Sequence, residues 1–347
     1  MSSRSASTVQ GPKMICLRTL PWRQVTFRPV CRSLSTQLIG QEQGHGSSTT
    51  TASRQAAIQR NSQLFDELMD KQRTSVARVE KIQINVQNIG PYPDMCLLMN
   101  KHLSTPFHCA QHVSQLFVER SVYAKLNDDQ LWDMHRPLDQ DCTLTFHHFK
   151  EDDTLQANRI FWRSCSFLLG KVIQDTFKES IPLHLHSWPK PNFKLGSFIY
   201  DVQLPSLSDW KPSETELITL TKVFVQLQSQ NLPIQRLSVH VDLATKLFDQ
   251  NPFKLQQLKE IANRDANAQV NVYRVDQHLD FSVGPMIPHT GFVGRVSITA
   301  VHPIESQSIG KLYRFQGVAL PLQLPMHSYP FKVLCDRSRQ LNSSPIP

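Results

Sequence analysis

The sequence predicts an α+β protein in which a small β-rich module precedes a larger α/β region. Residues 79–149 alternate apolar and polar side chains between turn-forming residues, as half-buried strands do. Residues 154–330 alternate helix-length and strand-length apolar segments. Apolar residues make up 40% of the chain, enough for buried cores, and no apolar run is long enough to cross a membrane. We therefore expect no membrane association.

Cysteines and charge exclude several classes of protein. The seven cysteines include no C-x-x-C pair, which argues against a disulfide framework and a cysteine-built zinc site. Residues 1–53 hold six Lys or Arg and one acidic residue, whereas the rest of the chain holds 31 basic and 28 acidic residues. A body this close to neutral cannot bind nucleic acid tightly through bulk charge alone.

The N-terminal composition is typical of a mitochondrial presequence. Residues 1–41 contain dispersed arginines, many Ser and Thr, and no acidic side chain. We predict a presequence over 1–34, cleaved after Leu34, and therefore a location in the mitochondrial matrix. A basic RNA-binding tail is the alternative. Residues 35–53 are predicted to be a flexible linker.

A helical extension is predicted over 54–75, because this segment has good helix formers and no Pro or Gly. Its apolar residues are irregularly spaced. We expect them to pack on the next domain or to form an exposed surface for a partner protein.

The order of elements in 79–149 predicts a ubiquitin-like β-grasp. Strands are expected at 79–86 and 95–99, followed by a helix that starts with Thr105 as N-cap and Pro106 in the first turn. Its apolar side is predicted to carry Cys109, Val113, Leu116 and Phe117. Two further strands follow, at 122–126 and 142–146.

The larger region, 154–330, is predicted to be a second domain. A Ser-x-x-Glu capping box from Ser213 to Glu216 marks the start of one of its helices. Helices are expected at 155–177, 213–229, 242–249 and 252–263, and strands at 198–204, 270–275, 295–301 and 312–320. Residues 331–347 are predicted to be a loose, basic, polar tail.

Patterns for common chemistry are weak. The twelve glycines form no phosphate-binding loop. His108 and His112 have the spacing of a zinc pair on a helix, but two surface histidines are the preferred interpretation. Cys165 lies among apolar helix residues and is predicted to be a core residue.

Four motifs in the larger region resemble the N-terminal editing domain of threonyl-tRNA synthetases. The β-grasp module is similar to the TGS-type module that precedes that domain, so the resemblance covers about residues 79–320. The motifs are Arg163–Gly170, Ser197–Val202, Asp280–Pro288 and Tyr313–Ala319.

Departures from the family indicate an inactive editing-like domain. The four positions where the resemblance implies two His, a Cys and a His carry Arg163, Phe167, Ser282 and Met286. Arg and Phe can neither bind a metal nor act as a base near neutral pH. Too few residues follow Ala319 for an aminoacylation domain. We expect no catalysis, metal, cofactor or small-molecule substrate.

The combination of presequence, β-grasp and altered editing domain resembles a family of mitochondrial large-ribosomal-subunit proteins. Local features fit, including Trp132-Asp133-Met134 and Gly284-Pro285. The resemblance implies a structural role, with mitochondrial ribosomal proteins and rRNA as partners. The alternatives are a free-standing hydrolase of mischarged threonine tRNA and a non-catalytic RNA-binding regulator.

Candidate RNA contacts are the basic residues near the C-terminus and one on the altered helix. For the C-terminal residues, the alternative is a solvated terminus that contacts no RNA. For Arg163, the alternative is an ion pair with an internal carboxylate such as Asp201. The candidates are Arg163, Lys311, Arg314, Lys332, Arg337 and Arg339.

Overall fold

The computed structural model describes residues 51–346 except 77, 266, 307 and 308. The predicted presequence and all but the last three residues of the predicted linker lie outside this range. Those three residues are helical, so the helix begins earlier than predicted. None of the helices described is both long and apolar enough to span a membrane.

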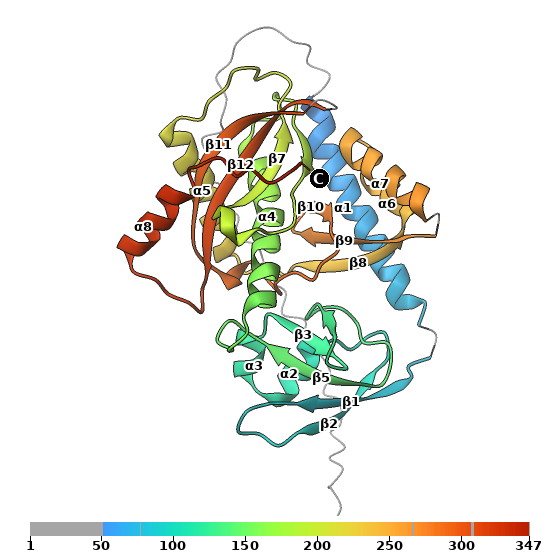
Figure 1. The fold of residues 1–347 in the computed structure, drawn as a ribbon. Coiled ribbons are helices and arrows are strands. Elements are labelled where there is room, and N and C mark those ends of the chain that lie inside the picture. Colours follow the sequence, from blue (N-terminus) through green and yellow to red (C-terminus); the bar gives the residue numbers. More distant parts are fainter. Residues whose placement is uncertain (1–50, 77, 266, 307–308, 347) are drawn as a thin grey trace, which may run out of the picture. The chain divides into compact units, whose positions relative to one another are not determined.

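Helix α1, Thr51–Thr74, packs on the chain itself (Figure 1). Phe65 is fully buried in a core with Leu237 and Val272 of a three-stranded sheet. Arg54 donates hydrogen bonds to the carbonyl oxygens of Ile181 and Phe177. Of the two alternatives predicted for this helix, the structure favours packing on a following part of the chain, because the chain's own sheet covers Phe65.

The β-rich module has the predicted β-grasp arrangement. Its five strands lie in the order β2-β1-β5-β3-β4, with β1 and β5 parallel and the other pairs antiparallel. Thr105 and His108 close a capping box at the start of its first helix, as the Thr-Pro pair indicated. The elements are β1 Lys81–Gln87, β2 Met95–Asn100, α2 Pro106–Val113, α3 Gln115–Arg120, β3 Tyr123–Leu126, β4 Gln130–Trp132 and β5 Cys142–His147.

The predicted single helix after Thr105 is in fact two helices. Ser114 has extended backbone angles and separates α2 from α3. The break rotates the second helix, so Leu116 is exposed while Cys109 and Phe117 are buried. Strand β4 was not predicted, because it is only three residues long.

The larger region contains two antiparallel sheets, ordered β10-β9-β8 and β11-β12-β7-β6. The predicted capping box of Ser213 is present, and every predicted helix and strand is found within a few residues of its expected ends. The elements are α4 Leu155–Thr176, β6 His184–Ser187, β7 Phe198–Gln203, α5 Glu214–Ser229, β8 Gln235–His240, α6 Val241–Leu247, α7 Pro252–Arg264, β9 Gln269–Val275, β10 His278–Phe281, β11 Val293–Ser306, β12 Gly310–Pro321 and α8 Ser328–Arg337.

Helix α4 is the central element of the larger region and contacts strands of both sheets (Figure 1). Most of its residues from Ile160 to Ile173 are buried, so tertiary packing stabilises this helix despite the glycine at position 170. Position 170 must be glycine, because a Cβ there would lie 2.8 Å from the Tyr200 ring. Helix α4 thereby brings the altered positions 163 and 167 to the junction of the two sheets.

The C-terminal segment is ordered against the four-stranded sheet, which corrects the predicted tail over 331–347. Residues 328–337 form α8, with Pro330 in the first turn, where a missing amide hydrogen costs little. Ser338 and Asn342 are almost completely buried. The Gln316 side chain of β12 donates to the carbonyl oxygens of Ser338 and Gln340, which holds the segment down.

Candidate functional site

Arg163 on α4 reaches the loop that follows β10. Its guanidinium donates to the carbonyl oxygens of Gly284 and Pro285, at 2.5 and 3.0 Å. Gly284 has a φ of +65°, and a Cβ there would lie 1.9 Å from the Tyr273 hydroxyl oxygen. Arg163 therefore closes this loop against the helix and does not pair with Asp201, the alternative that the sequence left open.

The other three altered positions are also engaged within the protein. Phe167 is fully buried, with its ring 5.2 Å from the His278 ring. Met286 is 1% exposed, and its sulfur accepts a hydrogen bond from the Ser164 hydroxyl. The Ser282 hydroxyl oxygen accepts from the Gly284 amide. Arg163 and Ser282 both bond to Gly284, and Met286 bonds to Ser164 on the same helix as Arg163, so these positions make contacts within the protein.

Asp133, in the loop after β4, joins the β-grasp module to this loop. Its carboxylate accepts from the Met286 amide at 2.8 Å and from the Tyr273 hydroxyl at 3.0 Å, and it lies 3.6 Å from Arg236 Nε. Burial raises the pKa of Asp133, and the Met286 amide is the strongest opposing influence. Sequence reasoning quoted Trp132-Asp133-Met134 only as part of a resemblance and missed this role.

A second buried polar cluster lies beside the altered positions. Lys254 Nζ is 2.6 Å from Asp280 Oδ1, and the Tyr200 hydroxyl donates to Asp280 Oδ2 at 2.5 Å. The ammonium also lies 5.0 Å from the Phe281 ring centroid. Burial lowers the pKa of Lys254, and Asp280 opposes this change. Lys254 carried no sequence signal, because it was simply one lysine on a predicted helix.

Two residues that the sequence analysis weighed for chemistry, Cys165 and His108, are engaged in the fold. Burial raises the pKa of Cys165 well above its usual value, so this thiol stays protonated and is a poor nucleophile. His108 Nδ1 accepts from the Thr105 amide in the capping box. Within the described ranges, no group of three or more His, Cys, Asp or Glu side chains could hold a metal ion.

Arg314, a candidate RNA contact, is instead a buried structural residue. It is 2% exposed and forms a two-pronged pair with Asp201, with Nε and Nη2 at 2.8 and 2.7 Å from the two carboxylate oxygens. Its Nη1 donates to the carbonyl oxygens of Asn342 and Ser344. The guanidinium is thus directed into the sheet and away from solvent.

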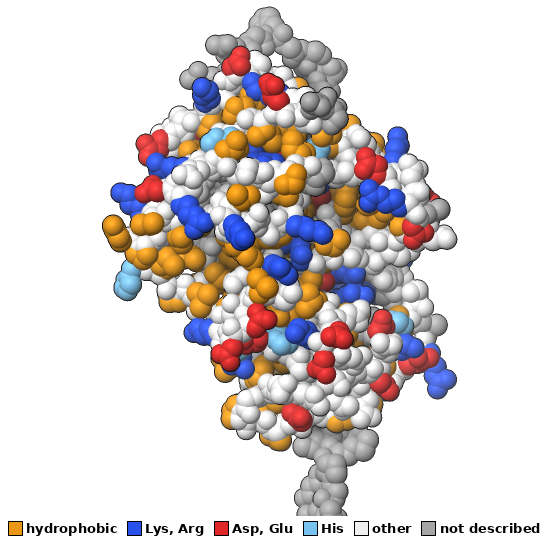
Figure 2. Space-filling model, viewed as in Figure 1, with side chains coloured by type: hydrophobic (Ala, Val, Ile, Leu, Met, Phe, Trp, Pro, Cys, Tyr) orange, Lys and Arg blue, Asp and Glu red, His pale blue; other side chains and the backbone are white. Residues whose placement is uncertain are grey.

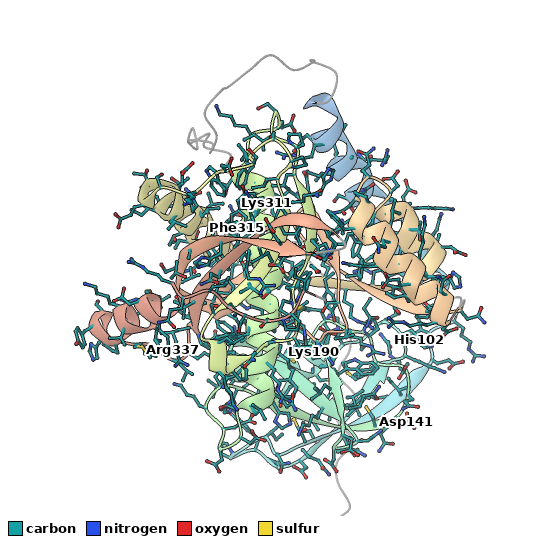
Figure 3. The ribbon with its side chains drawn as sticks, turned by 45° about the horizontal axis from the view of Figure 1, so that its top comes forward. His102, Asp141, Lys190, Lys311, Phe315 and Arg337 are labelled. Atoms are coloured by element: carbon teal, nitrogen blue, oxygen red, sulfur yellow. The ribbon has the colours of Figure 1, made fainter. Side chains whose placement is uncertain are left out.

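The remaining C-terminal candidates do not form one basic surface. Lys311 contacts Ser208 and Asp209, while Arg337 donates to the Lys194 carbonyl oxygen. Figure 3 shows Lys311 and Arg337 well separated, on β12 and α8. Arg339 lies 3.9 Å from Asp336, and Lys332 is exposed. Since no contact to RNA is part of this structure, these four stay predictions.

Comparison with known proteins gives two kinds of relative. The family model of the TGS domain matches residues 98–148. The chain is 39% identical over 293 residues to large ribosomal subunit protein mL39 of Drosophila melanogaster, covering 84% of this chain and 87% of that protein. The TGS match agrees with the predicted β-grasp module.

The second kind of relative is a group of threonine–tRNA ligases. The chain is 24% identical to a probable cytoplasmic threonine–tRNA ligase 1 of Dictyostelium discoideum, over 77% of this chain and 35% of that protein. It is 28% identical to the cytoplasmic threonine–tRNA ligase 2 of Homo sapiens, over 63% of this chain and 25% of that protein. The predicted resemblance to the synthetases is confirmed, and it covers only a minor part of their length.

Proposed function

The chain belongs to the family of large ribosomal subunit protein mL39, and from that premise we propose that it is a structural, non-catalytic constituent of the mitochondrial large ribosomal subunit. The observation that carries the proposal is a similarity that extends over most of both proteins.

The absence of catalysis is supported by the geometry of the altered positions. Arg163 bonds two backbone carbonyl oxygens of the 284–285 loop, Phe167 is buried beside the His278 ring, and Met286 is buried against Ser164 of α4. A guanidinium offers only donors, and a phenyl ring offers none, so neither can activate water. The positions that would hydrolyse an ester therefore stabilise the fold instead.

We further propose that residues 1–34 direct the chain to the mitochondrial matrix, and that 79–149 and 154–330 act as two domains. The arginine-rich, acid-free composition supports the first point. A buried core around Trp132 that is made only of residues from 79–149 supports the second. Mitochondrial ribosomal proteins and large-subunit rRNA would be the partners.

Sedimentation of lysed mitochondria tests the ribosomal role. The endogenous chain should be detected by antibody, because a C-terminal tag would disturb the buried Asn342. We expect it to co-sediment with large-subunit rRNA, and to stay there in moderate salt and after the two subunits are separated. A peak at the top of the gradient, or with the small subunit, would contradict the proposal.

A hydrolysis assay tests the absence of catalysis separately. The purified chain is incubated with threonine tRNA that carries serine, beside an editing-competent threonine–tRNA ligase as positive control. We expect the rate of serine release to equal that in buffer. Turnover above buffer that is lost when Lys254 is changed to Ala would show that the buried cluster retains an activity.

A further inference from the structure

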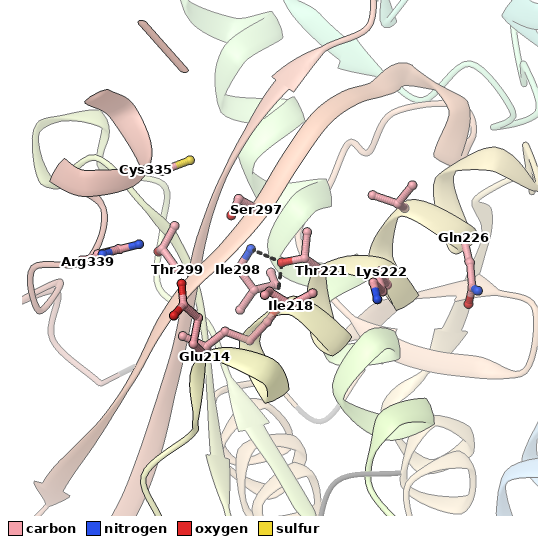
Figure 4. A pocket seen from close by; sticks show the side chains of 12 residues that line it. Glu214, Ile218, Thr221, Lys222, Gln226, Ser297, Ile298, Thr299, Cys335 and Arg339 are labelled. Atoms are coloured by element: carbon pink, nitrogen blue, oxygen red, sulfur yellow. Dashed lines mark hydrogen bonds between the residues drawn. The ribbon is translucent and has the colours of Figure 1, made fainter. Parts of the chain in front are cut away.

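A groove of about 420 Å³ lies between α5, β11 and the end of α8 (Figure 4). Ile298 of β11 forms its floor, and Ile218 and Val225 of α5 form one wall. Cys335 and Arg339 form the other wall. The Thr221 hydroxyl of α5 accepts a hydrogen bond from the Ile298 amide at 3.0 Å, which fixes the helix on the strand. The distance between α5 and β11 is thus fixed by the fold, and none of the residues that line the groove belongs to α4.

Apolar side chains around this groove remain exposed. Ile218 and Val225 are 47% and 43% exposed, although they lie seven residues apart on one face of α5. On α8, Tyr329 and Val333 are also exposed, but they are not among the residues that line the groove. Figure 2 shows hydrophobic side chains gathered over α8 and the segment before it. Exposed apolar side chains beside a groove are typical of a site of protein association.

Charge selects the class of occupant. Lys222 and Arg339 lie on opposite sides of Ile218 and Ile298 in Figure 4, and Arg339 also lies 3.9 Å from Asp336. Glu214 is the one acidic residue among those that line the groove. The chain's own residues 1–50 carry six basic side chains and one acidic one, so their net charge does not complement Lys222 and Arg339.

The lining also favours protein over RNA. Single-stranded RNA is bound by aromatic platforms for its bases and by rows of cations for its phosphates. The groove is lined on its apolar side by aliphatic Leu217, Ile218, Val225 and Ile298. Aliphatic walls with a charged rim are what an amphipathic helix recognises through residues at i, i+3, i+4 and i+7.

We propose that the α5–α8 groove binds an amphipathic helix of another protein, with acidic residues flanking the helix's apolar face. The proposal rests on the proposed function in one respect: the partner helix is expected to belong to a protein in mitochondria, where the chain is proposed to act. The apolar residues of that helix would contact Ile218, Val225 and Ile298, and its carboxylates would face Lys222 and Arg339.

Site-specific photocrosslinking in intact mitochondria tests the proposal whether or not the chain sediments with the ribosome. A photoreactive phenylalanine derivative replaces Val225 in the full chain, and Leu98, 60% exposed on β2, is the matched control. We expect position 225 to crosslink to a protein segment with helical apolar spacing and flanking Asp or Glu, and position 98 to give a different pattern. Crosslinks to rRNA, to a second copy or to residues 1–50, or no crosslink at all, would overturn the proposal.

Binding of the crosslinked segment, made as a peptide, gives the second readout. We expect Ile218→Asp and Lys222→Glu each to weaken its binding to the purified chain about tenfold or more, as loss of a central contact does. Leu98→Asp should leave the affinity unchanged, and thermal unfolding checks that each variant is folded. Unchanged binding by Lys222→Glu would refute the charge argument. If the chain sediments with the ribosome but position 225 crosslinks to something other than such a helix, the proposed groove partner is refuted and the proposed ribosomal function is not.

Discussion

Replacing Arg314 by Met should destabilise the protein without acting through RNA. The change removes the partner of Asp201, a carboxylate that is fully buried and whose pKa is raised by burial and held down by Arg314. Removing one member of a buried ion pair costs about 3–5 kcal/mol, because the other charge is left without compensation. The two carbonyl oxygens of Asn342 and Ser344 also lose their donor.

Urea unfolding followed by tryptophan fluorescence measures this loss. The Trp210 ring lies 6.0 Å from the Phe315 ring, so its emission reports the sheet that holds Arg314. We expect Arg314→Met to lower the free energy of unfolding by about 4 kcal/mol. Asp201→Leu should cost a similar amount, and the double variant should cost less than the sum, since neither charge is then left alone.

The control is Arg337→Met, because Arg337 is exposed and makes one hydrogen bond to a carbonyl oxygen. It should change stability by less than about 0.5 kcal/mol. The reasoning is refuted if Arg314→Met keeps full stability but dissociates from the large subunit, which would mean that the guanidinium contacts RNA.

Three further changes test other parts of the fold. Gly284→Ala should cost more than about 2 kcal/mol in urea unfolding, because Ala is strained at φ +65° and its Cβ would meet the Tyr273 hydroxyl. Lowering the pH should destabilise the protein between about 6.5 and about 4, because burial lowers the pKa of His135 and His289 to about 4 while the unfolded chain takes up protons from about pH 6.5. The urea midpoint should fall over that window and be flat above it. Phe65→Ala should cost about 3–5 kcal/mol by leaving a cavity under α1, measured by the same unfolding assay.

Matched variants separate these effects from general damage. Gly310→Ala has a similar positive φ but open space around its Cβ, so it should cost about 1 kcal/mol and no more. Leu116→Ala removes an exposed side chain and should change stability by less than about 0.5 kcal/mol. A midpoint that does not move between pH 6.5 and 4 would contradict the assignment of neutral, buried histidines.

Local signals explain which elements were predictable. The Ser213 capping box and the Thr105-Pro106 pair specify helix starts within four residues, and strand β1 alternates clearly. Strands β8 and β10 were not predicted. They are six and four residues long, and both pair with β9, a contact that no local sequence pattern reports. Helix α8 was missed because the polar residues from 336 onward suggested a loose tail.

The candidate site was predictable in position but not in its contacts. The motif resemblance identified Arg163, Phe167, Ser282 and Met286, and the fold brings these positions together. The partners of these residues depend on distant segments. Asp133 lies 153 residues before Met286 in sequence, and Asp201 lies 113 residues before Arg314. No local pattern reports such pairings, so an arginine in the sequence could not be assigned to the core or to the surface.

The hydrogen bonds of the C-terminal segment have a consequence for how the protein is made. Strand β12 leaves the ribosome before residues 338–344, yet Gln316 and Arg314 need the carbonyl oxygens of those residues, and the Asn342 side chain donates to Ser197 near the start of β7. The four-stranded sheet therefore cannot complete its interior bonds while the chain is still being synthesised. A chain that stops before residue 338 would keep every described strand and still leave the buried donors of Gln316 and Arg314 without their acceptors.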